Sequence, residues 1–260
     1  MIELDAFFRS ELGAFALELA RITGLVVVSP LLWADAPKTV RAAIVILLAF
    51  LVHGQGKVAP GIVGAPELAV IGIFGELMLG AAMGFVVRLV LAIAEVTANA
   101  ASPLIGFGIA QVFNPATGGD DTVLNALLQK VALWVALLTG MHHAVLGTLL
   151  ASFQAVPVGS IILPSRAFPL LLEMSSSVLS TGVRLALPLM AVLFMVQIAL
   201  GFVSRAAPAM QVFSVGFAFT LLTGGVVLAV SLPDFTRELA AELSFVGTRM
   251  ESVLLLARGP

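Results

Sequence analysis

Long stretches without a charged residue are the feature of this sequence that most restricts its fold. Residues 206–233 contain no charge, and residues 131–151 and 185–204 are also uncharged. A fourth stretch, residues 68–87, is interrupted only by Glu76. Because a helix needs about 20 apolar residues to cross the hydrocarbon core of a bilayer, these stretches predict an integral membrane protein.

The N-terminal part is expected to add one long helix and one short helix. Residues 12–33 are long enough to cross a membrane but contain Glu18 and Arg21, which lie three positions apart on one helix face and can therefore pair. Residues 40–52 are too short to cross alone. We therefore expect an all-α fold with five long helices and one short helix.

The most charged part of the chain follows residue 233. Its charged positions alternate with apolar ones, which is typical of an amphipathic helix. We predict that residues 234–260 form such a helix, with one face toward solvent and with Leu239, Leu243 and Val246 on the apolar side.

The composition excludes several classes of protein. Only 11% of the residues are charged, against about 25% in an average soluble domain, and 60% are apolar, which excludes an ordinary soluble enzyme. With 13 basic and 15 acidic residues the net charge is −2, and no basic stripe is present to bind nucleic acid. The chain has no cysteine, which excludes disulfides, thiolate metal sites and cysteine nucleophiles.

The sequence contains no motif for catalysis, cofactor binding or metal binding. It has no P-loop, so we do not expect ATP hydrolysis, and it has neither HExxH nor GxSxG. His142 and His143 are adjacent, and on a helix their side chains point about 100° apart, so they cannot face one metal ion together. We therefore expect a protein that is not an enzyme and has no cofactor.

A row of small and charged residues recurs at every fourth position and so follows one line along a helix: Gly72, Glu76, Gly80, Gly84 and Arg88. Small residues in such a row let another helix approach closely, and for the glycines we favour packing within the chain. Glu76 and Arg88 are about 18 Å apart along a helix, too far to pair with each other. Each therefore needs water, a partner in the chain or a neighbouring subunit.

Residues 96–123 form the most informative segment. They are uncharged until Asp120, rich in small residues, and interrupted by several prolines and glycines. Irregular backbone at membrane depth is tolerated only where protein buries it or where it lines an aqueous cavity. We therefore predict a plug loop that lines or closes a passage. Its residues are Gly106, Phe107, Gly108, Ile109, Val112, Phe113, Asn114 and Pro115.

Residues 200–217, LGFVSRAAPAMQVFSVGF, resemble the signature of the FliR family of flagellar type III export-gate proteins, which is related to the SctT family of injectisomes. Two further regions agree with this family in order and spacing. One is RITGLVVVSP at residues 21–30, followed by Pro37, Val40 and Arg41, and the other is residues 80–88, followed by the predicted plug loop. The resemblance covers about residues 10–235. Within the signature the matching residues are Arg205, Ala206, Pro208, Met210, Phe213 and Gly216.

Two positions depart from the family pattern. Ala209 stands where many relatives have an amide side chain, and Asn114 precedes Pro115 where an aspartate is common. Hydrogen bonds that relatives make at these positions therefore cannot be transferred to this chain. The sequence Val-Gly-Phe that ends at Phe217 favours the flagellar branch over the injectisome branch.

The resemblance implies a non-enzymatic subunit of the export gate in the flagellar basal body, inserted several times in the bacterial inner membrane. It implies assembly with FliP and FliQ homologues and with other export-apparatus proteins, and passage of unfolded flagellar proteins through the gate. Many apolar helices would then pack on neighbouring subunits instead of lipid. The implied division is a FliP-like part (1–174), a FliQ-like hairpin (175–233) and the charged tail (234–260). The residues expected at subunit contacts are Gly72, Glu76, Gly80, Gly84, Arg88, Arg184, Arg205, Pro208, Gln211, Phe213 and Gly216.

Other functions remain open at this point. A secondary transporter of a small solute would use Glu76 and Glu95 as coupling acids and the broken segment as its substrate site. An injectisome secretion subunit would use the same fold, and a plain scaffold subunit would have no moving part. For Glu95 and Arg184, which lie near helix ends, a position at an interface is favoured over a role in proton transfer.

Overall fold

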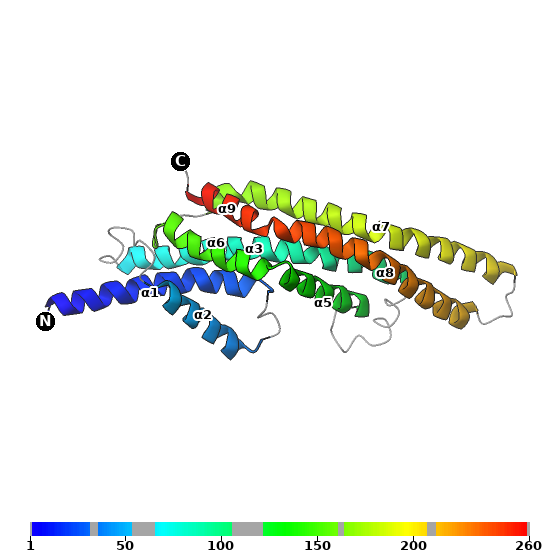
Figure 1. Ribbon diagram of the computed structural model, residues 1–260, viewed down its shortest axis with the longest axis horizontal. Coiled ribbons are helices and arrows are strands. Elements are labelled where there is room, and N and C mark those ends of the chain that lie inside the picture. Colours follow the sequence, from blue (N-terminus) through cyan, green and yellow to red (C-terminus); the bar gives the residue numbers. More distant parts are fainter. Residues whose placement is uncertain are drawn as a thin grey trace. The chain divides into compact units, whose positions relative to one another are not determined.

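The computed structural model describes residues 2–31, 36–53, 66–105, 122–160, 164–206 and 212–258. In these ranges the chain is almost entirely helical (Figure 1), which confirms the predicted all-α fold. The elements in chain order are α1 (Ile2–Val28), α2 (Lys38–Val52), α3 (Pro66–Ile105), α5 (Val123–Leu138), α6 (Met141–Ala155), the 3-10 helix η2 (Pro164–Ala167), α7 (Phe168–Ala206), α8 (Val212–Ser244) and α9 (Val246–Arg258).

Three helical segments of the described ranges are long and apolar enough to cross a membrane: Val70–Ile105, Phe168–Ala206 and Gly216–Ala257. The helices α5 and α6 add a fourth only if this pair, which is bent by 65°, counts as one span. The prediction of an integral membrane protein agrees with these lengths. Of the five long helices expected, four are present as α1, α3, α7 and α8, and the expected short helix is α2. The fifth, over residues 131–151, is divided between α5 and α6.

The helix predicted over residues 131–151 is interrupted at Gly140. This residue has a φ of 74°, in the left-handed region that glycine adopts easily because it has no Cβ. Its N–H donates to the Leu137 carbonyl at 3.1 Å, and its carbonyl accepts from the His143 N–H at 2.9 Å. The prediction was wrong here because the hydropathy of a stretch does not report the backbone conformation of one glycine within it.

Two compact units, each discontinuous in sequence, make up the chain. Unit 1 comprises Met1–Val90, Leu137–Ser175 and Leu243–Pro260, and unit 2 comprises Leu91–Ala136 and Ser176–Glu242. The division inferred from the resemblance follows sequence order instead, and it stays a prediction.

In unit 1, α2 lies beside α1, and α9 packs against α6 and η2 (Figure 1). At the contact between α9 and α6, a Cβ added at Gly247 would lie 3.6 Å from the Ala144 Cβ. Leu239, Leu243 and Val246 are buried, as predicted for the apolar side of the tail. The tail is not one helix, however, because residues 234–244 continue α8 and α9 begins at Val246.

The helices α1 and α3 approach so closely that their backbones touch. A Cβ added at Gly80 would lie 1.9 Å from the Arg21 carbonyl oxygen, and one added at Gly24 would lie 2.2 Å from the Leu77 carbonyl oxygen. A Cβ at Gly84 would lie 2.7 Å from the backbone of Leu25. These distances leave no room for any side chain. The glycine row of α3 therefore packs within the chain, as we favoured for the glycines.

In unit 2, α7 and α8 run antiparallel. Arg184 contacts Glu238, Leu193 lies against Gly224, and Leu200 lies against Gly216. The two helices of the predicted hairpin are therefore present, and both are longer than predicted.

The second half of α3 runs along α7 in the same unit. A Cβ added at Gly182 would lie 2.6 Å from the Val96 side chain, and the Thr97 hydroxyl donates to the Gly182 carbonyl at 3.0 Å. Further along, the Gln197 amide donates to the Leu104 carbonyl at 3.2 Å, which satisfies an oxygen at the C-terminal end of α3.

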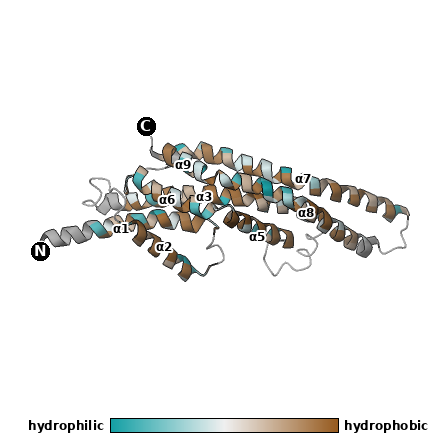
Figure 2. Ribbon diagram, in the orientation of Figure 1, coloured by the Kyte–Doolittle hydropathy of each residue, from teal (hydrophilic) through white to brown (hydrophobic). Residues whose placement is uncertain are grey.

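Apolar residues cover much of α2, α5, α7 and α8 (Figure 2). Many of these side chains are exposed, including Leu47 and Phe50 on α2 and Leu138 on α5. A single soluble chain rarely exposes so much apolar surface, so lipid or other subunits must cover it.

Candidate functional site

A buried ion pair joins α1 to α3 in unit 1. The Arg21 Nε donates to Glu76 Oε2 at 2.5 Å, and the Arg21 Nη2 donates to Glu76 Oε1 at 3.0 Å. The side chains of Arg21 and Glu76 are 0% and 1% exposed. The bidentate geometry is the strong form of a guanidinium–carboxylate contact, with both charges removed from solvent.

The guanidinium of Arg21 also binds the end of α6. Its Nη1 donates to the Ser152 carbonyl at 2.9 Å and to the Ser152 hydroxyl at 3.2 Å, and its Nη2 donates to the Val156 carbonyl at 3.3 Å. The guanidinium carbon lies 4.5 Å from the centre of the Phe153 ring, within the range of a cation–π contact. Arg21 therefore contacts two carbonyl groups, one hydroxyl and one aromatic ring at the end of α6.

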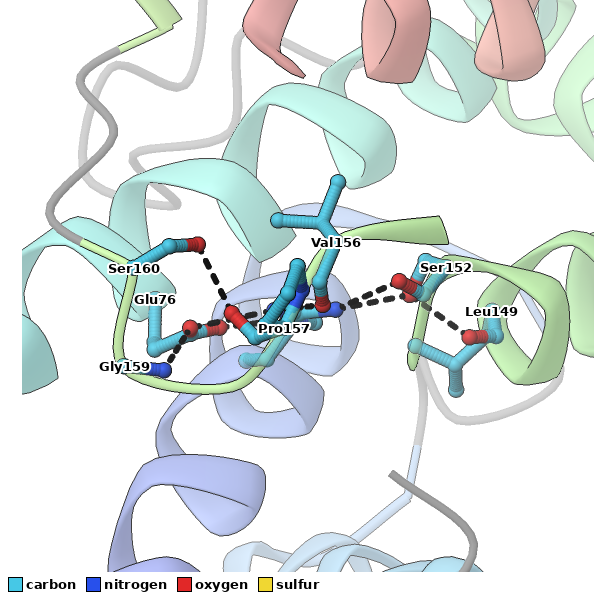
Figure 3. Close-up of polar contacts among 8 residues, drawn as sticks. Glu76, Leu149, Ser152, Val156, Pro157, Gly159 and Ser160 are labelled. Carbon is cyan, nitrogen blue, oxygen red and sulfur yellow. Dashed lines mark hydrogen bonds and ion pairs between the residues drawn. The ribbon is translucent and has the colours of Figure 1, made fainter. Parts of the chain in front are cut away.

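The carboxylate of Glu76 holds the segment that follows α6 (Figure 3). The Gly159 N–H donates to Glu76 Oε1 at 2.8 Å. The same segment turns through a hydrogen bond from the Ser160 hydroxyl to the Pro157 carbonyl, at 2.7 Å. We call Arg21, Glu76, Ser152, Val156 and Gly159 the buried ionic network.

The buried ionic network fixes three elements in one arrangement, namely α1, α3 and the end of α6 with its following segment. A buried pair of charges is costly to desolvate, and the loss of one partner leaves the other charge uncompensated, at a cost of about 3–5 kcal/mol. Alternative arrangements of the three elements are therefore strongly disfavoured. The network can position helices, but it contains no nucleophile paired with a general base.

The pairing predicted between Glu18 and Arg21 is wrong. Arg21 pairs with Glu76 on another helix, because that carboxylate can accept two hydrogen bonds from the guanidinium while both are buried. Glu18 accepts instead from His53 Nδ1, at 3.0 Å, and its side chain is 2% exposed. Glu11 lies 3.4 Å from the other ring nitrogen of His53, and the Phe15 ring stands edge-on to the imidazole.

From the sequence we predicted that Glu76 needs a partner, but we did not identify Arg21 as that partner. The sequence signal that could have identified the pair is that Arg21 and Glu76 are opposite charges, each inside an otherwise apolar helix, and such charges usually pair with each other. Gly72, one turn before Glu76, is buried against Leu17 and Gly159. The burial of Glu76 and Gly72 in unit 1 means that their contacts lie within the chain.

The other predicted contact residues lie apart from the buried ionic network. Arg88 and Arg205 are exposed, and Arg184 forms an exposed ion pair with Glu238. Gly216 is buried and packs on Leu200. Phe213 belongs to α8, but its side chain is not among those described, and Pro208 and Gln211 lie outside the described residues. The named residues of the predicted plug loop also lie outside them: Gly106, Phe107, Gly108, Ile109, Val112, Phe113, Asn114 and Pro115. The prediction of irregular backbone was wrong for residues 96–105, which continue α3 as a helix with Pro103 inside it.

The rings of the adjacent histidines lie close together, although side chains at successive helix positions were expected to point about 100° apart. The ring centres of His142 and His143 are 3.9 Å apart. Across the ranges that the structure describes, no three side chains of His, Cys, Asp or Glu are grouped so that they could hold a metal ion. The two histidines therefore have no third ligand there.

Comparison with known proteins identifies similarity along almost the whole chain. The family model described as "Bacterial export proteins, family 1" matches residues 12–245. The Flagellar biosynthetic protein FliR of Escherichia coli K12 is 27% identical over 244 residues, which cover 90% of this chain and 91% of that protein. The proteins of the same name from Caulobacter vibrioides and Bacillus subtilis are 27% and 25% identical, and the matches cover 84% of this chain in each case. The matched proteins are similar in length to this chain.

Proposed function

Because the chain belongs to the bacterial export proteins, family 1, we infer that it is a subunit of the flagellar protein export gate. The observation that carries this function is the match over residues 12–245, together with relatives that are named for flagellar biosynthesis. Its role is then in flagellum biogenesis, as a structural component through which flagellar proteins are exported. Nothing favours the injectisome branch.

The partners follow from this assignment. We propose that the chain assembles with FliP and FliQ homologues in the bacterial inner membrane and receives unfolded flagellar proteins as its cargo. The exposed apolar surface on α2 and α5 supports assembly with other subunits. The residues between α7 and α8, with Arg205, Pro208 and Gln211, are proposed as one of the contacts.

The chain contributes structure and gating instead of chemistry. The buried ionic network supports this view, because it makes a rigid frame of α1, α3 and α6. Energy for export would come from other components, since the sequence has no nucleotide-binding motif.

Residues 106–121 are proposed as the plug of this gate. Their two flanks are held together, because the Ser102 and Thr122 hydroxyl oxygens are 2.7 Å apart and hydrogen-bonded in a buried position. The chain therefore leaves α3 and returns to α5 at nearly the same place, as a loop inserted into a passage requires.

Complementation of a strain that lacks this subunit tests the proposed function. The intact chain should restore motility and secretion of flagellar proteins, and FliP and FliQ homologues should copurify with it. Deletion of residues 106–121 should raise ion leakage through the membrane in cells that still assemble the gate. Unchanged leakage in such cells would contradict the plug assignment without affecting the assignment to the export gate.

A secondary transporter is the second candidate, and the described residues do not favour it. One of its coupling acids, Glu76, is bound to Arg21 and to the Gly159 N–H, away from solvent. Uptake of a small solute by the purified chain alone would favour the transporter over the export gate.

A further inference from the structure

A histidine directly after the last residue of α2 lies between two carboxylates of α1 in unit 1. The Nδ1 of His53 is 3.0 Å from Glu18 Oε2, and its Nε2 is 3.4 Å from Glu11 Oε2. Glu11, Phe15 and Glu18 follow one line along α1, because they are spaced by four and three positions. Phe15 stands edge-on to the imidazole and also contacts Phe50 of α2, with ring centres 5.1 Å apart. We call Glu11, Glu18 and His53 the His53 cluster.

The Glu18 carboxylate is buried and needs a positive partner or a proton. Its side chain is 2% exposed, and a carboxylate removed from water is costly to ionise without a positive partner. Arg21, three positions away, cannot be that partner, because its five N–H groups all donate within the buried ionic network. Among the described residues, the structure gives Glu18 the ring of His53 instead.

The protonated ring suits this position better than the neutral ring. A neutral imidazole has one N–H and can donate to one acceptor, whereas the imidazolium donates from both nitrogens. Both ring nitrogens of His53 face carboxylate oxygens, so only the protonated ring can donate to Glu11 and Glu18 at once. Loss of the proton leaves one carboxylate facing a ring lone pair, and the cluster then holds two negative charges and no positive charge.

The other charged side chains that the structure describes on these helices do not replace His53. Lys38 and Arg41 lie at the opposite end of α2, at least 12 positions away, which is about 18 Å along the helix. Arg21 on α1 and Glu76 on α3 pair with each other. In the part of the chain that the structure describes, the positive charge available to the two carboxylates is therefore that of His53.

Protons can reach the His53 cluster from solvent. The side chains of His53 and Glu11 are 31% and 49% exposed, while Glu18 is buried. Histidine is the side chain whose charge ordinarily changes between about pH 5 and 8. The charge of the ring can therefore follow the pH of the surrounding water, and the buried carboxylate of Glu18 responds through the ring.

We propose that the His53 cluster is a proton-dependent latch that holds α2 against α1. With His53 protonated, the ring joins both carboxylates and α2 is docked. Because the docked state retains a proton that the undocked state releases more easily, docking is favoured at low pH and weakens as the pH rises. Undocking would uncover Val45, Ala49 and Val52, the buried face of α2. The pH would thus change the apolar surface that α2 offers to other subunits.

A distance between two spin labels tests the proposal, because the chain has no native cysteine. Cysteines at Val27 on α1 and Leu47 on α2, both exposed and outside the His53 cluster, are labelled with nitroxides in the full chain. The protein is purified in detergent with the subunits that accompany it and frozen at about pH 5.5, about pH 7 and about pH 8.5, across the range in which histidine titrates. Double electron–electron resonance then gives the populations of docked and undocked α2.

We expect one short distance at low pH and a second, longer distance whose population grows as the pH rises. Coupling to one proton limits the change in the ratio of the two populations to about tenfold per pH unit. His53→Gln cannot gain a proton, and Glu18→Gln removes the buried charge. Each of these variants should therefore give populations that do not change with pH.

The double variant His142→Gln/His143→Gln is the matched control, because it removes the other two histidines of the chain and should keep the pH dependence. Distances that do not change with pH in the chain with native His53 would overturn the proposal. A pH dependence that persists in His53→Gln would overturn it equally. If His53→Gln fails to fold, Glu18→Gln decides on the same terms. These outcomes leave the export assignment untouched, since complementation tests that assignment separately.

Discussion

Arg21 on α1 and Glu76 on α3 form a bidentate ion pair, although 55 residues separate them in the sequence. Both side chains are excluded from solvent, and both make further hydrogen bonds to the end of α6 and the segment after it. The position of three elements therefore depends on these two charges. Loss of either one would leave the other buried without its partner.

Removal of either charge alone should destabilise the protein by about 3–5 kcal/mol, because the other charge stays buried without its partner. Arg21→Met and Glu76→Leu should each lower the temperature of thermal unfolding in detergent and reduce motility in the complementation assay. The double variant Arg21→Met/Glu76→Leu should lose less than the sum of the two, since no unpaired charge remains. Losses that simply add would contradict the coupling, and Arg88→Met, at an exposed position on α3, is the control that should have little effect.

The close crossing of α1 and α3 should tolerate no side chain at Gly80. In Gly80→Ala the new Cβ would meet the Arg21 carbonyl oxygen at 1.9 Å, and because that oxygen belongs to the backbone, the helices must separate. We expect a loss of about 1–3 kcal/mol or more in the free energy of unfolding. Gly13→Ala, on α1 with open space around the added Cβ, is the matched control and should be neutral or slightly stabilising. Equal stability of the two variants would mean that the helices are not in close contact.

Sequence reasoning predicted the helical class and the membrane character because these depend on composition and on the length of uncharged stretches. It also identified the glycine row of α3, because the spacing of small residues on a helix reports a close neighbour. It could not identify that neighbour as α1. The partner of a residue such as Glu76 depends on which helices meet in space, and two equally good carboxylates, Glu18 and Glu76, were available to Arg21.

The helix break at Gly140 was missed for a different reason. Residues 131–151 are apolar throughout, and nothing in their hydropathy separates a straight helix from two helices joined at an angle. The sequence shows that residue 140 is glycine, but it does not show whether this glycine adopts a helical conformation or a positive φ. Residues 106–121 of the predicted plug loop lie outside the described residues, so their assignment rests on composition and resemblance, supported by the closeness of Ser102 and Thr122.

His53 should hold α2 against α1 through the buried carboxylate of Glu18. In His53→Ala the carboxylate loses the ring nitrogen at 3.0 Å while it stays buried, and we expect a loss of about 1–3 kcal/mol. Limited proteolysis should then cleave α2 faster. Glu11→Ala should have a much smaller effect, because Glu11 is about half exposed and surface pairs contribute only about 0–1 kcal/mol. An equal effect of the two substitutions would argue against the special role of Glu18.

Gly140→Ala should weaken the junction between α5 and α6 through backbone conformation alone. The space around an added Cβ is open, since the nearest atom, His143 Nδ1, is 3.8 Å away, so a steric clash is not the cause. An L-residue in the left-handed region costs about 1–2 kcal/mol, which is the expected loss in the free energy of unfolding. Gly140→Asn should lose less, because asparagine tolerates this region better. Gly147→Ala, within α6 and also with open space, should be neutral or slightly stabilising. If Gly140→Ala were as stable as Gly147→Ala, the two helices would form one continuous span and the bend would not be a property of the folded chain.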